Sequence, residues 1–136
     1  MVLDLSSFKK AVNSLNEVLD ELEKDKTNKF VKDSAVQRFE YTYELAYKML
    51  RRFLEITEHS KQQVEEMSFS NIIRTANEKG LLLNDLEKWV IYREKRNITS
   101  HVYDENKADS VISVIPDFFK ESDFLLNKLS ERVGRL

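Results

Sequence analysis

The stretch AVQRFEYTYELAYKMLRRFLEITE, residues 35–58, decides the fold class of this chain. Its apolar residues recur at intervals of three and four, the spacing that places side chains along one face of an α-helix. Ser34 followed by Gln37 matches a capping box, so we expect the helix to begin at Ser34 and to extend to about Glu58. The face expected to be buried consists of Phe39, Tyr43, Ala46, Tyr47, Leu50 and Leu54.

The aromatic residues of this helix have two candidate roles. Their density in FEYTYELAYK, residues 39–48, is compatible with stacking on nucleic-acid bases. Their helical spacing favours a buried core or an interface instead. The tyrosine hydroxyls indicate that part of this face meets something polar, and we expect either Arg38 or Glu40 to line a cleft.

Shorter periodic segments predict helices on both sides of this one. Residues 6–24 form an amphipathic pattern, with Ser6 or Ser7 as the expected N-cap. Ser68 is expected to cap a short helix that Gly80 ends, because glycine readily takes the left-handed conformation at a helix C-terminus.

Two more helices are predicted in the C-terminal half. Asn84 with Glu87 predicts the start of a helix that contains LEKWVIYREKRN, residues 86–97. Apolar residues at helical spacing over residues 108–129 predict a final helix. Pro116 must kink or split that helix, because proline removes a backbone donor and clashes with the preceding turn.

The composition supports an all-α protein with a single domain. A chain of 136 residues buries one core but not two, so residues 1–136 are expected to form one domain. Two glycines and one proline leave few residues for the tight turns of a small β fold. Five periodic segments therefore predict an all-α fold.

Several classes of protein are disfavoured by the same composition. The chain has no cysteine, which excludes disulfides, thiolate metal sites and a cysteine nucleophile, and is compatible with the reducing cytoplasm. No apolar run reaches the roughly 18 residues of a membrane span, and MVLDLSSFKK does not resemble a signal peptide. A net charge of −2 provides no general attraction for nucleic acid, so RNA or a nucleotide is expected only at a local cleft. We expect a cytoplasmic protein with no membrane contact.

The helical stripe of residues 86–97 changes character toward its end. Along one face, an apolar group gives way to a polar and cationic one, in the order Leu86, Trp89, Val90, Arg93, Arg96, Asn97, Ser100 and His101. Burying a guanidinium or an imidazole is costly unless the group is paired. We therefore expect a water-filled cleft, a carboxylate neighbour or a second subunit to meet these groups.

The cluster has a structural and a chemical interpretation. In the first, Arg96 and His101 donate to the last helical carbonyls and Asn97 caps the turn. In the second, His101 exchanges a proton near neutral pH, Arg96 holds a phosphate, and Asn97 orients the imidazole or a phosphate oxygen. These parts suit metal-independent cleavage of a phosphodiester by an internal 2′-hydroxyl, which makes RNA the natural substrate.

The residues of this cluster resemble a known motif. Residues 96–103, RNITSHVY, match the pattern R-x4-H-x-Y of HEPN proteins, the higher eukaryote and prokaryote nucleotide-binding superfamily. DSAVQRFEYTYELAYKML, GLLLNDLEKW and HVYDENKA also resemble the branch that contains nucleotidyltransferase substrate-binding proteins and HepT toxins. The resemblance extends over about residues 5 to 130.

The resemblance implies an up-and-down bundle of four to five helices that forms a homodimer. It implies Arg96 and His101 as the catalytic pair of a ribonuclease, with Asn97 as the adjoining polar residue. It also implies a minimal nucleotidyltransferase as partner, which neutralises the toxin by adding AMP to Tyr103. No metal and no cofactor is expected. The chain lacks the Gly-Ser loop and the Asp-x-Asp pair of a nucleotidyltransferase, so we do not expect it to be that enzyme itself.

Two other functions remain open from the sequence. The chain is alternatively a non-catalytic subunit that binds a nucleotide or substrate for the nucleotidyltransferase, with Arg93 and Arg96 as phosphate holders. The third alternative is a structural dimer with a capped helix end.

Overall fold

The computed structural model describes residues 3–101 and 103–136, so Val102 within the R-x4-H-x-Y motif lies outside the described residues. The described residues contain no strand, and the all-α prediction is confirmed. The helices are α1 (Ser6–Lys24), α2 (Lys29–Thr57), α3 (Lys61–Glu65), α4 (Phe69–Glu78), α5 (Leu86–Asn97), the 3₁₀ helix η1 (Thr99–His101), α6 (Glu105–Ile112) and α7 (Ile115–Val133).

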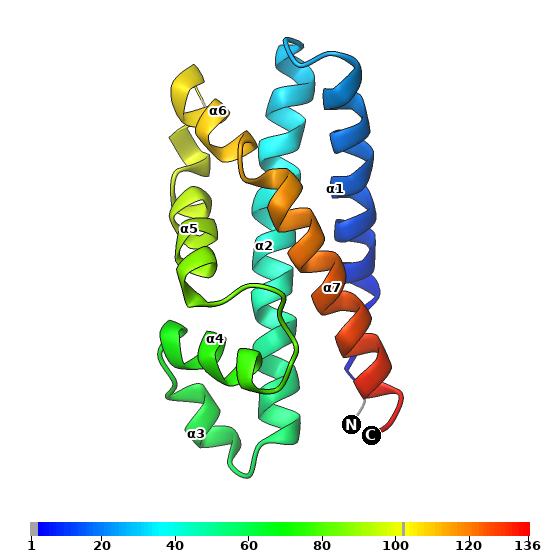
Figure 1. The fold of residues 1–136 in the computed structure, drawn as a ribbon, viewed down its shortest axis with the longest axis vertical. Coiled ribbons are helices and arrows are strands. Elements are labelled where there is room, and N and C mark those ends of the chain that lie inside the picture. Colours follow the sequence, from blue (N-terminus) through cyan, green and yellow to red (C-terminus); the bar gives the residue numbers. More distant parts are fainter. Residues whose placement is uncertain (1–2, 102) are drawn as a thin grey trace.

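The long helices form the predicted up-and-down bundle. Figure 1 shows α1 rising, α2 descending beside it, α5 rising on the other side of α2, and α7 descending across the front. The short helices α3 and α4 cross the lower end of the bundle, and α6 follows α5 at the upper end. None of the helices in the described residues is both long enough and apolar enough to cross a membrane.

An aromatic cluster holds α2, α5 and α7 together. The Phe118 ring of α7 lies 5.1 Å from Phe39 and 5.0 Å from Tyr92, and Trp89 lies 5.5 Å from Tyr92, measured between ring centroids. All four side chains are buried. The predicted buried face of α2 is also confirmed, except that Tyr47 is only half-buried.

Three predicted helix starts are wrong, beginning with those of α2 and α1. Asn28, rather than Ser34, caps α2, and its side-chain oxygen accepts from the backbone N–H groups of Phe30 and Val31. The apolar period continues upstream through Val31, which packs on the core, so the helix extends past Ser34. At α1 the N-cap position is Leu5, not Ser6 or Ser7.

The start predicted for α5 is wrong in the same way. Asp85 occupies the N-cap position, and the Asn84 amide donates instead to the Tyr92 hydroxyl at 3.1 Å. The polar stretch before Ser68 also contains a helix that the sequence did not predict. This helix, α3, is capped by Ser60, whose hydroxyl accepts from the Gln63 N–H at 3.2 Å.

The predicted end signals are confirmed. Gly80 has a φ of +73° directly after α4, where its N–H donates to the Asn77 carbonyl, and the next N–H, of Leu81, donates to Ala76. This is the Schellman arrangement, which favours glycine because a side chain at positive φ is strained. Pro116 lies in the first turn of α7 and splits the predicted final helix into α6 and α7.

A buried carboxylate fixes the beginning of α5. Glu121 of α7 has no exposed surface and accepts three hydrogen bonds, from the Leu83 N–H at 2.7 Å, the Asn84 N–H at 3.0 Å and the Trp89 indole at 2.7 Å. Burial raises the pKa of this carboxyl, although the three donors oppose the shift. Glu121 thus anchors the loop and helix that lead to the motif residues.

Candidate functional site

The motif residues occupy a sharp bend between α5 and α6. Arg96 and Asn97 end α5, and His101 ends η1. The His101 N–H donates to the Ile98 carbonyl at 3.0 Å, and the Asp104 N–H donates to the His101 carbonyl at 3.1 Å. Asp104 then caps α6 by accepting from the Asn106 N–H at 3.0 Å. The backbone therefore brings the end of α5 and the start of α6 close together.

Arg96 pairs across the bundle with a carboxylate. Its guanidinium forms a salt bridge with Glu44 of α2, and about a third of the Arg96 side chain is exposed. A carboxylate neighbour was one of the three expected arrangements. The interpretation in which Arg96 donates to the end of its own helix is wrong, because Glu44 takes the guanidinium instead.

A second glutamate, one turn before Glu44 on α2, anchors the segment that follows Arg96. The Thr99 hydroxyl lies 2.5 Å from the Glu40 carboxylate and 2.8 Å from the Arg96 carbonyl. Thr99 is almost completely buried. Of the two candidates for lining a cleft, Arg38 lines a hollow between α1 and α2, where it donates to the Ser14 carbonyl at 2.7 Å, whereas Glu40 contacts the motif segment through Thr99.

The side chains of Asn97, His101 and Tyr103 face solvent. His101 and Asn97 are exposed, and no hydrogen bond joins the His101 ring or the Asn97 amide to another described residue. Tyr103 is 84% exposed, and its ring centroid lies 6.1 Å from that of His101. An imidazole, an amide and a phenol of the motif are thus available to a ligand or to a second protein.

The buried face predicted for α5 is partly wrong. Trp89 is fully buried as expected, but Val90 is 39% exposed and Tyr92 takes the next buried position. The Tyr92 hydroxyl donates to Asp117 of α7, so a polar contact fixes this side of the helix toward the core. The rotation leaves Arg93 on the exposed side, whereas Arg96 follows Trp89 and Tyr92 toward α2.

Arg93 pairs with no carboxylate among the described residues. Its guanidinium lies 4.6 Å from the ring centroid of Phe69 on α4, a cation–π arrangement. Tyr43 lies near both arginines: burial raises the pKa of its hydroxyl, and the charges of Arg93 and Arg96 oppose that shift. The sequence placed Arg93 and Arg96 in one cluster, and the structure gives them different partners, Phe69 for Arg93 and Glu44 for Arg96.

Glu44 is the site residue that the sequence analysis missed. It lies 52 residues before Arg96, and its charge looks like that of any solvated helix face. The only local signal was a pair of glutamates one turn apart on the helix with the aromatic stripe. Among the described residues, no three His, Asp or Glu side chains lie together as the ligands of a metal ion would.

Comparison with known proteins identifies relatives of this chain. The family model described as "Nucleotidyltransferase substrate binding protein like" matches residues 3–131. A Haemophilus influenzae protein named "Probable ribonuclease HepT" is 45% identical over 98 residues, which cover 72% of this chain and 66% of that protein. The chain therefore spans slightly less than two thirds of that relative.

Two solved structures share the fold. One, from Haemophilus influenzae, was described as revealing the fold of a substrate binding domain of a nucleotidyltransferase, and it matches with a TM-score of 0.86 at 36% identity over 93% of this chain and 99% of that chain. A crystal structure from Thermus thermophilus matches with a TM-score of 0.70 at 30% identity over 90% and 98% of the two chains. The resemblance inferred from the motif is confirmed, and the chain belongs to the family of nucleotidyltransferase substrate binding protein like proteins.

Proposed function

We propose that this chain is a HepT-type, metal-independent endoribonuclease of the cytoplasm, which acts as a homodimer and is neutralised by a minimal nucleotidyltransferase. The observation that carries the proposal is the anchored Arg96 beside an exposed His101 and Asn97. A relative named as a probable ribonuclease supports it. The fold of a nucleotidyltransferase substrate-binding domain supports the choice of partner.

In the proposed reaction, the RNA supplies its own nucleophile. The 2′-oxygen attacks the adjacent phosphorus, and the bond from phosphorus to the 5′-oxygen breaks. A base takes the proton of the 2′-hydroxyl, and an acid gives a proton to the leaving 5′-oxygen. His101 is the motif side chain suited to either transfer, because an imidazole gains and loses a proton near neutral pH.

Arg96 and Asn97 complete the proposed site. The Arg96 guanidinium stabilises the negative charge that grows on the phosphate oxygens in the transition state. Glu44 holds that guanidinium in place, and Asn97 orients the imidazole or a phosphate oxygen. One imidazole cannot lie beside the attacking and the leaving oxygen at once, so two His101 rings in one cleft suit the chemistry better than one.

The exposed side of α5 supports a homodimer. Val90 and Ile91 are each more than a third exposed there, and Leu83 before the helix is 55% exposed. Pairing two copies through this side covers apolar surface and brings two sets of motif residues together. We expect light scattering at micromolar concentration to give about twice the 16.1 kDa chain mass. A strictly monomeric protein would contradict the shared cleft.

Tyr103 is the proposed acceptor of AMP from the partner enzyme. Its exposure beside His101 allows a nucleotidyltransferase to reach the hydroxyl, and an attached phosphate would repel incoming RNA and occupy the arginine. Co-expression with the cognate enzyme is expected to add one or more AMP masses to the peptide that contains Tyr103. Tyr103→Phe should abolish both the mass shift and the neutralisation. Unmodified chain that still copurifies with the enzyme would contradict this switch.

The second candidate is a non-catalytic nucleotide- or substrate-binding subunit of a two-component nucleotidyltransferase. It is favoured by the similarity to a Haemophilus influenzae structure described as a substrate binding domain of a nucleotidyltransferase, and by Arg93, which is exposed and pairs with no carboxylate among the described residues. Incubating the purified chain with single-stranded RNA in EDTA distinguishes the ribonuclease from the binding subunit. Cleavage supports the ribonuclease, whereas nucleotide binding without cleavage supports the binding subunit.

A further inference from the structure

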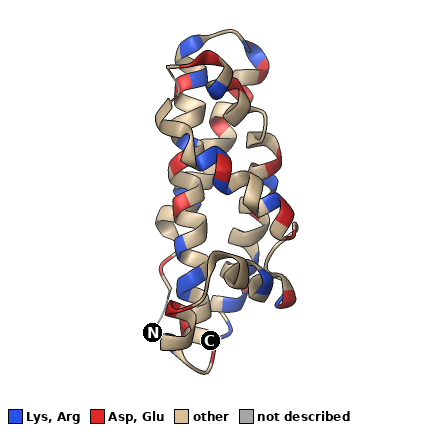
Figure 2. Cartoon of the chain, turned by 90° about the vertical axis from the view of Figure 1, so that its left-hand side faces the viewer, with Lys and Arg blue, Asp and Glu red and all other residues tan. Residues whose placement is uncertain are grey.

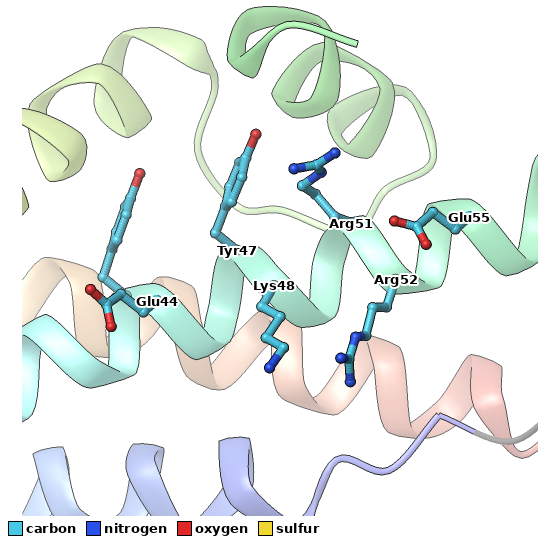
Figure 3. A pocket seen from close by; sticks show the side chains of 7 residues that line it. Glu44, Tyr47, Lys48, Arg51, Arg52 and Glu55 are labelled. Carbon is cyan, nitrogen blue, oxygen red and sulfur yellow. The ribbon is translucent and has the colours of Figure 1, made fainter. Parts of the chain in front are cut away.

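A shallow hollow lies on the outer face of α2, next to the proposed active site. Its volume is about 360 Å³. Figure 3 shows Tyr47, Lys48, Arg51 and Arg52 along it, between Glu44 and Glu55. Glu44 lines one end of the hollow and also pairs with Arg96, so the hollow adjoins the proposed active site. At about 1.5 Å per helical residue, it extends for roughly 16 Å along α2.

The charge in the hollow favours an anion. Three cations line it against two carboxylates, and one of these, Glu44, is already paired with Arg96. Lys48 and Arg52 are exposed and have no salt bridge to another described residue. Figure 2 shows both signs of charge distributed along the bundle, so this local excess stands out from a mixed surface.

Arg51 has an unsatisfied donor in this hollow. Its Nε is buried and has no hydrogen-bond partner among the described residues, and its terminal nitrogen donates to the Glu65 carbonyl at a long 3.4 Å. Buried polar groups are nearly always paired, so an unpaired one requires an explanation. A bound phosphate oxygen would supply the missing acceptor.

A pair of stacked aromatic rings lies on the Arg51 side of the hollow. The Tyr47 ring stacks on Phe69 of α4 with 5.5 Å between centroids and 28° between planes, and Phe69 also carries the Arg93 guanidinium. Figure 3 shows Tyr47 and Arg51 directed to one side of α2, and Lys48 and Arg52 directed to the other. A groove lined by cations and an aromatic ring is the combination that binds single-stranded nucleic acid.

We propose that the hollow binds the single-stranded RNA that flanks the cut site, with Lys48, Arg51 and Arg52 on its phosphates and Tyr47 against a base. The assignment rests on the proposed ribonuclease function, since it gives that activity its substrate class. The Glu55 carboxylate repels phosphate and therefore marks the end of the hollow that the RNA occupies. The contacts are to backbone and base face, so little sequence preference is expected from this subsite.

Binding is tested with a labelled, uncleavable 2′-O-methyl oligonucleotide by fluorescence anisotropy. Lys48→Gln/Arg52→Gln removes two exposed cations and is expected to weaken binding about tenfold at low salt and to reduce the salt dependence. Lys120→Gln/Arg135→Gln, which removes the same two residue types from α7 and the C-terminus, should leave affinity unchanged. Arg51→Gln should weaken binding about as strongly as the first pair.

Two variants of Tyr47 test the stacking contact. Tyr47→Leu is expected to weaken binding about fivefold or more, and Tyr47→Phe, which keeps the ring, should not. Thermal unfolding checks that each variant is folded. The proposal would be overturned if Lys48→Gln/Arg52→Gln bound the oligonucleotide as tightly as the control Lys120→Gln/Arg135→Gln. Loss of the dimer in the variants of the hollow would also overturn it, because the hollow would then be a contact between subunits. Binding through the hollow without cleavage of ordinary RNA would instead refute only the ribonuclease.

Discussion

Replacing His101 with alanine is expected to slow RNA cleavage by at least about a hundredfold, the usual effect of removing a general acid or base. In the proposed mechanism the exposed imidazole moves protons to and from the RNA oxygens, and the motif contains no second histidine to replace it. Initial rates on a single-stranded RNA in EDTA measure the effect. The variant is expected to fold normally, because the His101 side chain is exposed and makes no hydrogen bond to another described residue.

His59 provides a matched control. It is the other histidine of the chain, is exposed, and lies in the connection between α2 and α3. His59→Ala should retain full activity. Arg96→Lys should lose most of it, because lysine keeps the charge but not the planar fork that Glu44 holds. Activity that survives His101→Ala, or that requires added Mg²⁺, is incompatible with the proposed mechanism.

The largest effect on stability is expected from Glu121→Ala, which should lower the free energy of unfolding by about 3–5 kcal/mol. The change leaves the Leu83 and Asn84 N–H groups and the Trp89 indole without their acceptor in a buried place. Urea unfolding followed by circular dichroism measures the loss. Glu23→Ala on the exposed side of α1 is the control and should change stability by less than about 0.5 kcal/mol. A similar small effect of Glu121→Ala would show that the anchor is dispensable.

The same carboxyl gives stability a pH dependence of defined sign. Burial raises its pKa in the folded protein above the ordinary value of 4.5, so the folded state binds this proton more tightly than the unfolded state. The contribution of Glu121 to the free energy of unfolding is therefore fully present below about pH 4.5, and it declines as the pH rises through the raised pKa. The Glu121→Gln variant should lack that decline.

Local patterns predicted the helices better than their boundaries. The apolar period of α2 and the helix-ending glycine after α4 depend only on neighbouring residues, and the structure contains both. The cap of α2 was missed because Ser34 and Gln37 imitate a capping box inside a helix that Asn28 had already begun. Short capping patterns occur by chance, and tertiary packing decides which one is used.

Contacts between segments that lie far apart in the sequence could not be predicted from it. Nothing near Glu44 or Glu121 distinguishes these carboxylates from solvated ones, yet the first holds Arg96 and the second is fully buried. The orientation of α5 was mispredicted for a related reason: Tyr92, rather than Val90, faces the core because Asp117 and Asn84 satisfy its hydroxyl. The sequence singled out the motif residues because they interrupt an apolar period, and their role stays a prediction.

The ends of the RNA products test the central claim most directly. Attack by the 2′-oxygen predicts one product with a 2′,3′-cyclic phosphate and another with a 5′-hydroxyl, formed in EDTA by the wild-type protein and not by His101→Ala. Mass spectrometry of the cleaved oligonucleotide distinguishes these ends from those of hydrolysis by water. Products with a 5′-phosphate and a 3′-hydroxyl, or an RNA that stays intact with the wild-type protein, would contradict the account.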